Sequence, residues 1–371
     1  YIGHETANGV PLVLETTSDT ELMNNPRASV QQVYGRIMED LDEAITLLTG
    51  ASARADKAEI SVEVAYGLRA RANLLMGKWA AAASDAAKAY GTSAPYSVAD
   101  VSQPTFYNAT DNAWIWGIVV TTEDYLAKTG IVNWPSNLCS LTGMGYTTAA
   151  SATDVAYRLI NKNLWAKIPE TDVRKGWWVD EDLHSPVLDN GLGEDYAYYW
   201  ANGMFNGGTF PSKFSPYTNV KFGPDNGTFA DTDNAQDWPL MRVEEMKLIE
   251  AEALGRDNLA TGKQKLEEFV RQYRDPSYTC TASSLDAFID EVWFQRRVEL
   301  WGEGFALFDI LRLKKPIIRQ GANYPINSTF AEIAAEAPIM IYRIPEAETS
   351  VNSAITEADN NPAAMAPTPV N

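Results

Sequence analysis

The sequence predicts a mainly α-helical fold in which helical hairpins form one body around a large, irregular, loop-rich insertion. Apolar residues recur at helical spacing towards both ends of the 371 residues, whereas the middle is rich in turn residues and aromatic rings. We therefore divide the chain into residues 1–90, 91–239 and 240–371. The first and last segments are expected to pack together, and the middle one to carry a candidate ligand platform. A hydrophobic content of 45% is enough for a large core.

The first segment is expected to contain a long helix followed by a helical hairpin. Residues 1–26 are irregular, and a helical stripe that stops at Gly50 then begins, formed by Val33, Ile37, Leu41, Ala44, Ile45 and Leu48. A second helical block, residues 59–89, breaks at Gly77-Lys78-Trp79. This helix–turn–helix pattern resembles a tetratricopeptide unit, and an ordinary pair of antiparallel helices would give the same pattern.

Helical periodicity returns at Leu240 in the last segment. Residues 241–254 and 262–273 are predicted to form a second hairpin, with its break within residues 255–261. Ser283 or Ser284 is expected to cap a long helix that runs to Trp301. After Gly302 and Gly304 a shorter helix is predicted, and the chain beyond Pro338 reads as an extended tail.

The insertion has weak periodicity of any kind. Residues 111–120 read as a short strand, and a helical signal appears only near residues 154–167. Gly-rich and Asn-Gly turns occupy most of the remainder, in sequence between aromatic clusters. A long stretch without strong periodicity inside a compact protein is usually functional or inserted.

Charge and cysteine content limit the classes of function. The net charge of −19 repels phosphate backbones, so nucleic acid is not an expected partner. The same field argues against strongly anionic polysaccharides unless a local basic patch overrules it. No apolar run is long enough for a membrane-spanning helix, and residues 1–14 carry no signal-peptide features, which fits a cytosolic protein or one whose targeting part was removed. The two cysteines, Cys139 and Cys280, are either buried thiols or one bridge.

Known catalytic motifs are missing from the sequence. His4 and His184 are the only histidines, and neither a nucleophile-elbow motif nor a phosphate-binding loop occurs. The best-placed carboxylate pair, Glu299 and Glu303, belongs to an Arg-rich region, so we predict a structural ion-pair cluster that also contains Arg297, Asp309 and Arg312. Asp231-Thr232-Asp233-Asn234 lacks the central Gly and terminal Glu of a calcium loop. We predict no catalytic residue, no metal and no cofactor.

Aromatic rings in the insertion are the better indication of function. The apolar faces of sugars stack on Trp and Tyr rings, while nearby Asn and Asp side chains bond to hydroxyl groups. The competing interpretation is that the rings fasten long loops to the helical body. Trp114, Trp116, Trp293 and Trp301 are interpreted as core residues. The predicted ligand-binding residues are Trp134, Tyr146, Trp177, Trp178, Tyr196, Tyr198, Tyr199 and Trp200.

Six stretches, in the right order and spread over nearly the whole chain, resemble the SusD/RagB family. They are Asn8-Gly9-Val10-Pro11-Leu12-Val13 with the helix that follows Arg27, the helical hairpin of residues 65–89, Asp172-x-Arg174, Arg242…Glu245…Ala251-Glu252-Ala253, Arg297-x-Glu299-Leu300…Glu303-Gly304…Phe308-Asp309…Arg312, and Tyr342-Arg343-Ile344-Pro345-Glu346…Asn360-Asn361-Pro362. Ala306 departs from the family, which usually has Arg at this place. Family members are also longer at the N-terminus, so the chain is expected to be truncated there.

The resemblance implies a tetratricopeptide-like helical fold and a binding protein without enzymatic activity. It further implies glycan binding for nutrient uptake and polysaccharide utilisation, with delivery to a SusC-like TonB-dependent transporter. The location would be the surface of the outer membrane of a Gram-negative bacterium, through an N-terminal lipid anchor that this sequence does not contain. Two alternatives remain open. A RagB-like peptide-binding protein would share every one of these motifs, and a carbohydrate-active hydrolase would need an acidic pair, which Asp180, Glu181, Glu194 or Asp195 could provide.

Overall fold

The computed structural model describes residues 1–128, 138–142, 157–204, 213–324 and 332–363. Helices dominate this part of the chain, and its strands are short and form only two-stranded sheets. The predicted mainly α-helical class is therefore confirmed. None of the helices in the described ranges combines the length and the apolar character needed to cross a membrane.

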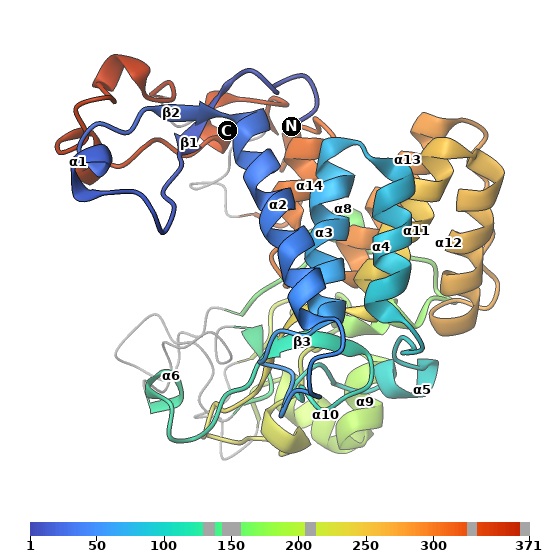
Figure 1. Ribbon diagram of the computed structural model, residues 1–371. Coiled ribbons are helices and arrows are strands. Elements are labelled where there is room, and N and C mark those ends of the chain that lie inside the picture. Colours follow the sequence, from blue (N-terminus) through green and yellow to red (C-terminus); the bar gives the residue numbers. More distant parts are fainter. Residues whose placement is uncertain (129–137, 143–156, 205–212, 325–331, 364–371) are drawn as a thin grey trace.

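A row of helices forms the body of the molecule. Each helix contacts the next in the order α2, α3, α4, α11 and α12, and α13 packs against α11. Figure 1 shows these helices side by side, although they come from opposite parts of the sequence. Their bounds are α2 (Val30–Leu48), α3 (Val62–Met76), α4 (Trp79–Tyr90), α11 (Val243–Asp257), α12 (Leu259–Tyr273) and α13 (Leu285–Glu299). The division into three segments stays a prediction, but helices from the first and last segments do pack together.

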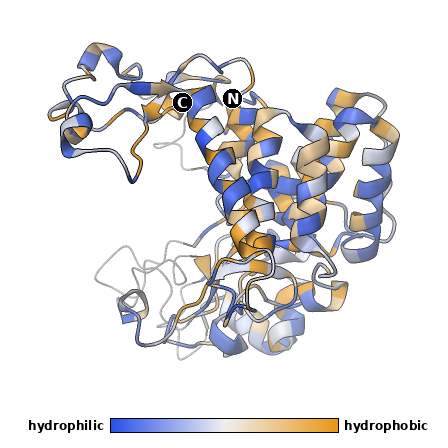
Figure 2. Ribbon diagram, in the orientation of Figure 1, coloured by the Kyte–Doolittle hydropathy of each residue, from blue (hydrophilic) through white to orange (hydrophobic). Residues whose placement is uncertain are grey.

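The turn between α3 and α4 lies where the sequence predicts it. Gly77 ends α3 with a φ of 75°, in the left-handed region that a glycine adopts without steric penalty. Helix α4 then packs against α11 through buried alanines, whose small side chains let the two helices approach closely. Helix α11 contacts α4, α12 and α13, and it is buried on nearly every face. The helices at the two ends of the row, α2 and α12, are amphipathic, as Figure 2 shows.

Glycines set the contact between α11 and α12. The helices are separated by Asn258 alone, which is a shorter break than the sequence predicts. A Cβ atom on Gly262 would lie 2.3 Å from the Cα atom of Gly255, so the two backbones touch at this point. Ser284, one of the two predicted caps, begins α13 by accepting a hydrogen bond from the Ala287 amide.

The strands form three antiparallel pairs, one of which joins segments that are distant in the sequence. Strand β1 (Asn8–Pro11) pairs with β2 (Arg27–Ser29), and β5 (Ile317–Ile318) pairs with β6 (Glu332–Ile333). Strand β3 (Trp114–Ile118) confirms the strand predicted at residues 111–120, and it pairs with β4 (Trp238–Arg242). Because β4 leads directly into α11, the β3–β4 pair attaches both ends of the insertion to the helical row.

The insertion has a core of its own. Buried aromatic rings from distant parts of the insertion, including Phe106, Trp177, Trp178 and Phe222, pack in one cluster. Short helices surround this cluster: α5 (Val98–Val101), α6 (Tyr125–Lys128), α8 (Lys162–Trp165), η2 (Val173–Trp177), α9 (Pro186–Leu192), α10 (Glu194–Ala201) and η4 (Asp225–Gly227). Helix α10 occupies residues that the sequence analysis assigned to loop.

The N-terminal turn and the C-terminal tail hold each other. Asn25 and Asn352 exchange two hydrogen bonds of 3.0 and 2.7 Å, and the Arg27 guanidinium donates to the Asn361 side chain at 2.9 Å. Figure 1 shows both segments together at one end of the row. The remaining short helices are α1 (Asp19–Leu22), α14 (Ala306–Arg312), η6 (Pro338–Met340), α15 (Glu346–Thr349) and η7 (Glu357–Asp359).

The glycine contact gives a first prediction. Gly262→Ala places a methyl group inside the α11–α12 contact and should lower the free energy of unfolding by about 1–3 kcal/mol. Gly35→Ala is the matched control, since a Cβ atom at this position of α2 meets nothing within 4 Å. It should raise stability by about 0.5–1 kcal/mol through helix propensity. Urea denaturation of both variants measures the difference, and equal effects would contradict the assigned contact.

Candidate functional site

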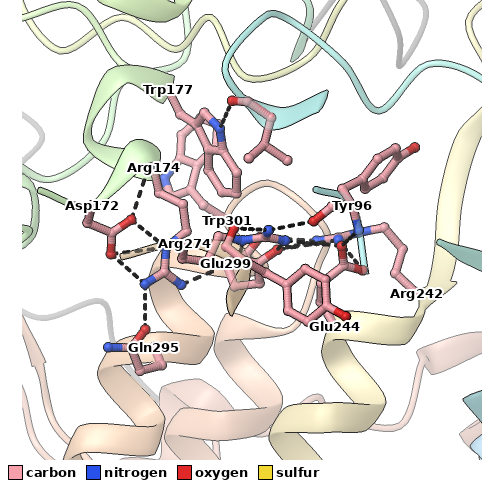
Figure 3. Close-up of polar contacts among 12 residues, drawn as sticks. Tyr96, Asp172, Arg174, Trp177, Arg242, Glu244, Arg274, Gln295, Glu299 and Trp301 are labelled. Atoms are coloured by element: carbon pink, nitrogen blue, oxygen red, sulfur yellow. Dashed lines mark hydrogen bonds and ion pairs between the residues drawn. The ribbon is translucent and has the colours of Figure 1, made fainter. Parts of the chain in front are cut away.

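A buried network of charged side chains is centred on Glu299, where the insertion meets the helical row. The carboxylate accepts hydrogen bonds of 2.8 and 2.9 Å from Arg274, which ends α12. Arg174 from η2 lies 3.3 Å away, and Arg242 from β4 lies 3.4 Å away. All four side chains are 0% exposed. Figure 3 shows the three guanidinium groups converging on this one carboxylate.

Further carboxylates complete the charge balance. Glu244 pairs with Arg242 at 2.7 Å, Asp172 pairs with Arg174 at 2.6 Å, and Glu303 lies 2.7 Å from the Lys221 ammonium group. A second chain of ion pairs extends along α11, α13 and α14. Its members are Glu252, Arg256, Arg296, Asp309 and Arg312.

The structure corrects one member of the predicted ion-pair cluster, Arg297. Glu299, Glu303, Asp309 and Arg312 do lie in the two connected sets of ion pairs. Arg297 does not: its guanidinium carbon lies 4.9 Å from the centre of the Trp293 ring, because it leaves α13 on another face. The sequence does not predict that Arg174, Arg242 and Arg274 are partners of Glu299, because nothing in their spacing links them to α13.

The network leaves no carboxylate available for acid–base chemistry. Burial by itself raises the pKa of Glu303, but Arg242 and Lys221 reverse this and hold the pKa below its usual range. Burial lowers the pKa of Lys221 to about 8. Because each charged group already bonds to opposite charges, we interpret the network as structural.

Three of the predicted ligand-binding rings are core residues. Trp177 is 0% exposed, and Trp178 and Trp200 are each 1% exposed, so no face of these rings is open to a ligand. The indole nitrogens of Trp177 and Trp200 donate to the backbone carbonyls of Val101 and Ser140. The prediction is corrected for these three rings: burying their large apolar surface stabilises the insertion. Trp134 and Tyr146 lie outside the described residues.

The three remaining predicted residues are exposed aromatic rings on one helix. Tyr196, Tyr198 and Tyr199 are 59%, 57% and 47% exposed. They project from α10, whose opposite face is held in the core by Ala197, Trp200 and Ala201. We name these three rings the α10 tyrosine face. The burial of Ala197, Trp200 and Ala201 leaves Tyr198 and Tyr199 on the outer side of the helix, with ring centres 6.0 Å apart, and Tyr196 at the edge of the buried side.

A small acidic hollow adjoins this face. It has a volume of about 140 Å³ and is lined by Asp182, Leu183, His184, Leu188, Asp189, Glu194, Ala197 and Tyr198. The imidazole of His184 lies 2.6 Å from the Asp189 carboxylate. Asp180 accepts two backbone hydrogen bonds, and Glu181 accepts one from the Tyr217 hydroxyl at 2.7 Å. Rings beside carboxylates can stack on a sugar and accept hydrogen bonds from its hydroxyl groups.

A larger cavity of about 770 Å³ lies between the insertion and the C-terminal helices. Residues of α8, α13, α14 and β5 line it. Trp293 and Trp301, which the sequence analysis interpreted as core, both border this space and are only partly buried. We name it the α13–α14 cavity.

The residues that the structure describes contain neither a group arranged to hold a metal ion nor a disulfide bond. No group of three or more His, Cys, Asp and Glu side chains in these ranges is arranged to hold a metal ion. Cys139 and Cys280 are both free and buried, which decides between the two possibilities left open by the sequence. Burial raises the pKa of the Cys139 thiol to about 12, so this group is protonated at neutral pH.

The Glu299 network gives a second prediction. Glu299→Gln removes the negative charge shared by three buried guanidinium groups and should lower the free energy of unfolding by about 3–5 kcal/mol. Glu43→Gln, at an exposed position of α2, is the matched control and should change stability by less than about 0.5 kcal/mol. Chemical denaturation of the two variants checks this expectation, and an unchanged Glu299→Gln variant would contradict it.

The second chain of ion pairs gives a prediction for acid denaturation. Burial by itself raises the pKa of Glu252, but Arg312 and Arg256 overcome it and lower the pKa to about 2. A depressed carboxylate pKa adds stability above the unfolded-state value of about 4.3, and this contribution is lost as the pH falls towards the folded-state value. Stability should therefore decrease between about pH 4.5 and 2. In Glu252→Gln the slope should be shallower over this interval; an identical slope would be the contrary result.

Comparison with known proteins agrees with the geometry. A family model described as the SusD family matches residues 147–362, more than half of the chain. No curated protein matches.

Solved structures share the fold at low sequence identity. A SusD-like carbohydrate binding protein from Bacteroides vulgatus is 22% identical with a TM-score of 0.69, over 95% of this chain and 71% of that one. A SusD superfamily protein from Bacteroides thetaiotaomicron is 21% identical with a TM-score of 0.71, over 98% and 72%. A laminarin binding SusD-like protein is 21% identical with a TM-score of 0.51, over 84% and 67%. The fold is thus the tetratricopeptide-like helical one, and the chain belongs to the SusD family.

Proposed function

We propose that this chain captures glycans at the cell surface without altering them and delivers them to a SusC-like outer-membrane transporter. The observation that carries the proposal is the α10 tyrosine face, an exposed aromatic surface on a member of the SusD family. The laminarin binding protein that shares the fold supports a saccharide as the ligand class. We further propose that an N-terminal lipid anchor outside these residues holds the protein on the outer leaflet.

The chemistry of the face suits a neutral saccharide. Each tyrosine offers a flat apolar ring and a hydroxyl group, which match the apolar and polar sides of a pyranose. Carboxylates of Asp182, Asp189 and Glu194 in the adjoining hollow can accept hydrogen bonds from sugar hydroxyls. Because one ring and one sugar interact weakly, several rings on one short helix would act together on a polymer.

The rigidity of α10 favours binding as well. Trp200 is buried, donates a hydrogen bond of 3.2 Å to Ser140, and packs with its ring centre 4.2 Å from that of Phe229. The helix is therefore fixed by its inner face while the tyrosines remain outside. A surface that is already ordered loses little conformational entropy when a ligand binds.

Capture without hydrolysis fits the state of four carboxylates. Glu299 and Glu303 are held in buried ion pairs. Asp180 and Glu181 accept hydrogen bonds from other groups of the chain. A hydrolase would need an acid and a base facing one glycosidic bond. Release of reducing ends from the bound polysaccharide by the purified protein would contradict the proposal.

The α10 tyrosine face gives the fourth prediction. In native gels that contain neutral polysaccharides, laminarin among them, the parent protein should be retarded by at least one. Tyr196→Ala, Tyr198→Ala and Tyr199→Ala should each weaken the affinity for that polysaccharide by about 1–3 kcal/mol, which calorimetry would measure. Tyr342→Ala is the matched control, because this ring is 84% exposed outside the insertion. If all three folded variants bind like the control, the ligand platform lies elsewhere.

A further inference from the structure

The α13–α14 cavity has an unusual balance of charge. Four basic side chains border it, those of Arg158, Lys167, Arg296 and Arg297, and Asp309 is the one acidic residue among its lining residues that the structure describes. Asp309 is already engaged, since its two oxygens accept hydrogen bonds of 2.8 Å from Arg296 and Arg312. The cavity is therefore locally positive in a chain whose net charge is −19.

Two buried donors at this cavity have no partner within the described part of the chain. Arg296 is only 4% exposed, and its Nη1 atom makes no hydrogen bond. The same holds for the indole nitrogen of Trp293. A buried donor without an acceptor costs about 1–3 kcal/mol of free energy, so either side chain would be favoured in turning towards an acceptor bound in the cavity.

Arg297 adds a further donor group beside the cavity. It lies over the Trp293 ring, with 4.9 Å between the guanidinium carbon and the ring centre, and no ion pair holds it among the described residues. Burial lowers its pKa, with no carboxylate acting against this effect. Arginines that lack an internal carboxylate are suited to a carboxylate from a ligand, because the guanidinium group donates two parallel hydrogen bonds.

The remaining walls match a sugar ring. Trp293, Trp301, Phe305 and Tyr324 supply apolar surface, and the Asn161 and Asn163 side chains border the same space. A volume of about 770 Å³ lies within the range of small-molecule sites. The combination of aromatic walls, amide groups and guanidinium donors selects a ligand with an apolar face, hydroxyl groups and a negative charge.

We propose that the α13–α14 cavity binds an acidic saccharide, with its carboxylate on Arg297 and a pyranose ring against the aromatic wall. The inference rests on the proposed glycan-binding function but concerns a second site with another charge preference. The negative net charge of the chain argues against anionic polysaccharides in general, and the basic lining of this cavity would be a local exception. The tyrosine face would hold neutral parts of a polymer and the cavity an acidic residue.

The test is a titration with defined saccharides. Trimers of galacturonic acid, glucuronic acid and mannuronic acid, together with N-acetylneuraminic acid, are each titrated into the protein by calorimetry, with a galactose trimer as the neutral reference. At least one acidic ligand should bind about tenfold or more tightly than the reference, and added salt should weaken it. Arg297→Gln should weaken that ligand about tenfold or more.

Control variants make the result specific. Arg271→Gln removes the same charge from an exposed position of α12 and should leave the affinity for the acidic ligand unchanged. Because Arg297 makes no ion pair among the described residues, its variant should fold, which circular dichroism and thermal melting would check. Equal losses in the two variants would overturn the proposal, since they would indicate a non-specific field effect.

Other outcomes separate this proposal from the broader function. If no acidic ligand binds while a neutral polysaccharide still binds at the α10 tyrosine face, the cavity proposal alone is wrong. Failure of every saccharide to bind would overturn both. If sodium sulfate at matched ionic strength displaces the acidic saccharide completely and binds as tightly, the cavity recognises anions in general, and the saccharide assignment is refuted.

Discussion

The pairing of Glu299 with three buried arginines is the constraint on which the rest of the structure depends. A carboxylate removed from water must be compensated completely, and here Arg174, Arg242 and Arg274 supply the compensation from η2, β4 and the end of α12. Each of these segments must be in place before the charge is satisfied. The insertion is thereby attached to the helical row by electrostatics as well as by the β3–β4 pair.

This attachment determines where a ligand can bind. Because the aromatic core of the insertion is fixed against the network, Trp177 and Trp178 are buried directly beside it, and they are lost as stacking surfaces. Helix α10 lies at the outer side of that core and keeps exposed rings. The charged groups at the centre neutralise one another, so recognition is left to the surface and to the cavity beside α14.

The sequence predicts the helical row better than the site, for physical reasons. Periodicity is a local property, which is why the α3–α4 turn at Gly77 was predicted at the correct residue and the cap of α13 was predicted to be Ser283 or Ser284. Arg174 and Glu299 are 125 residues apart, and no local pattern records such a contact. Helix α10 was missed because eight residues that include three tyrosines resemble a turn-rich loop more than a helix.

The two candidate binding surfaces differ in charge and therefore suit different ligands. The hollow beside the α10 tyrosine face is lined by Asp182, Asp189 and Glu194, which repel a carboxylate but accept bonds from neutral hydroxyl groups. The α13–α14 cavity has the opposite sign, with donors at Arg296 and Trp293 that only an acceptor can satisfy. A neutral polymer would leave the positive charge of the cavity unbalanced, and a purely acidic one would be repelled at the tyrosine face. A saccharide that carries both neutral and acidic residues would suit the charge of both surfaces.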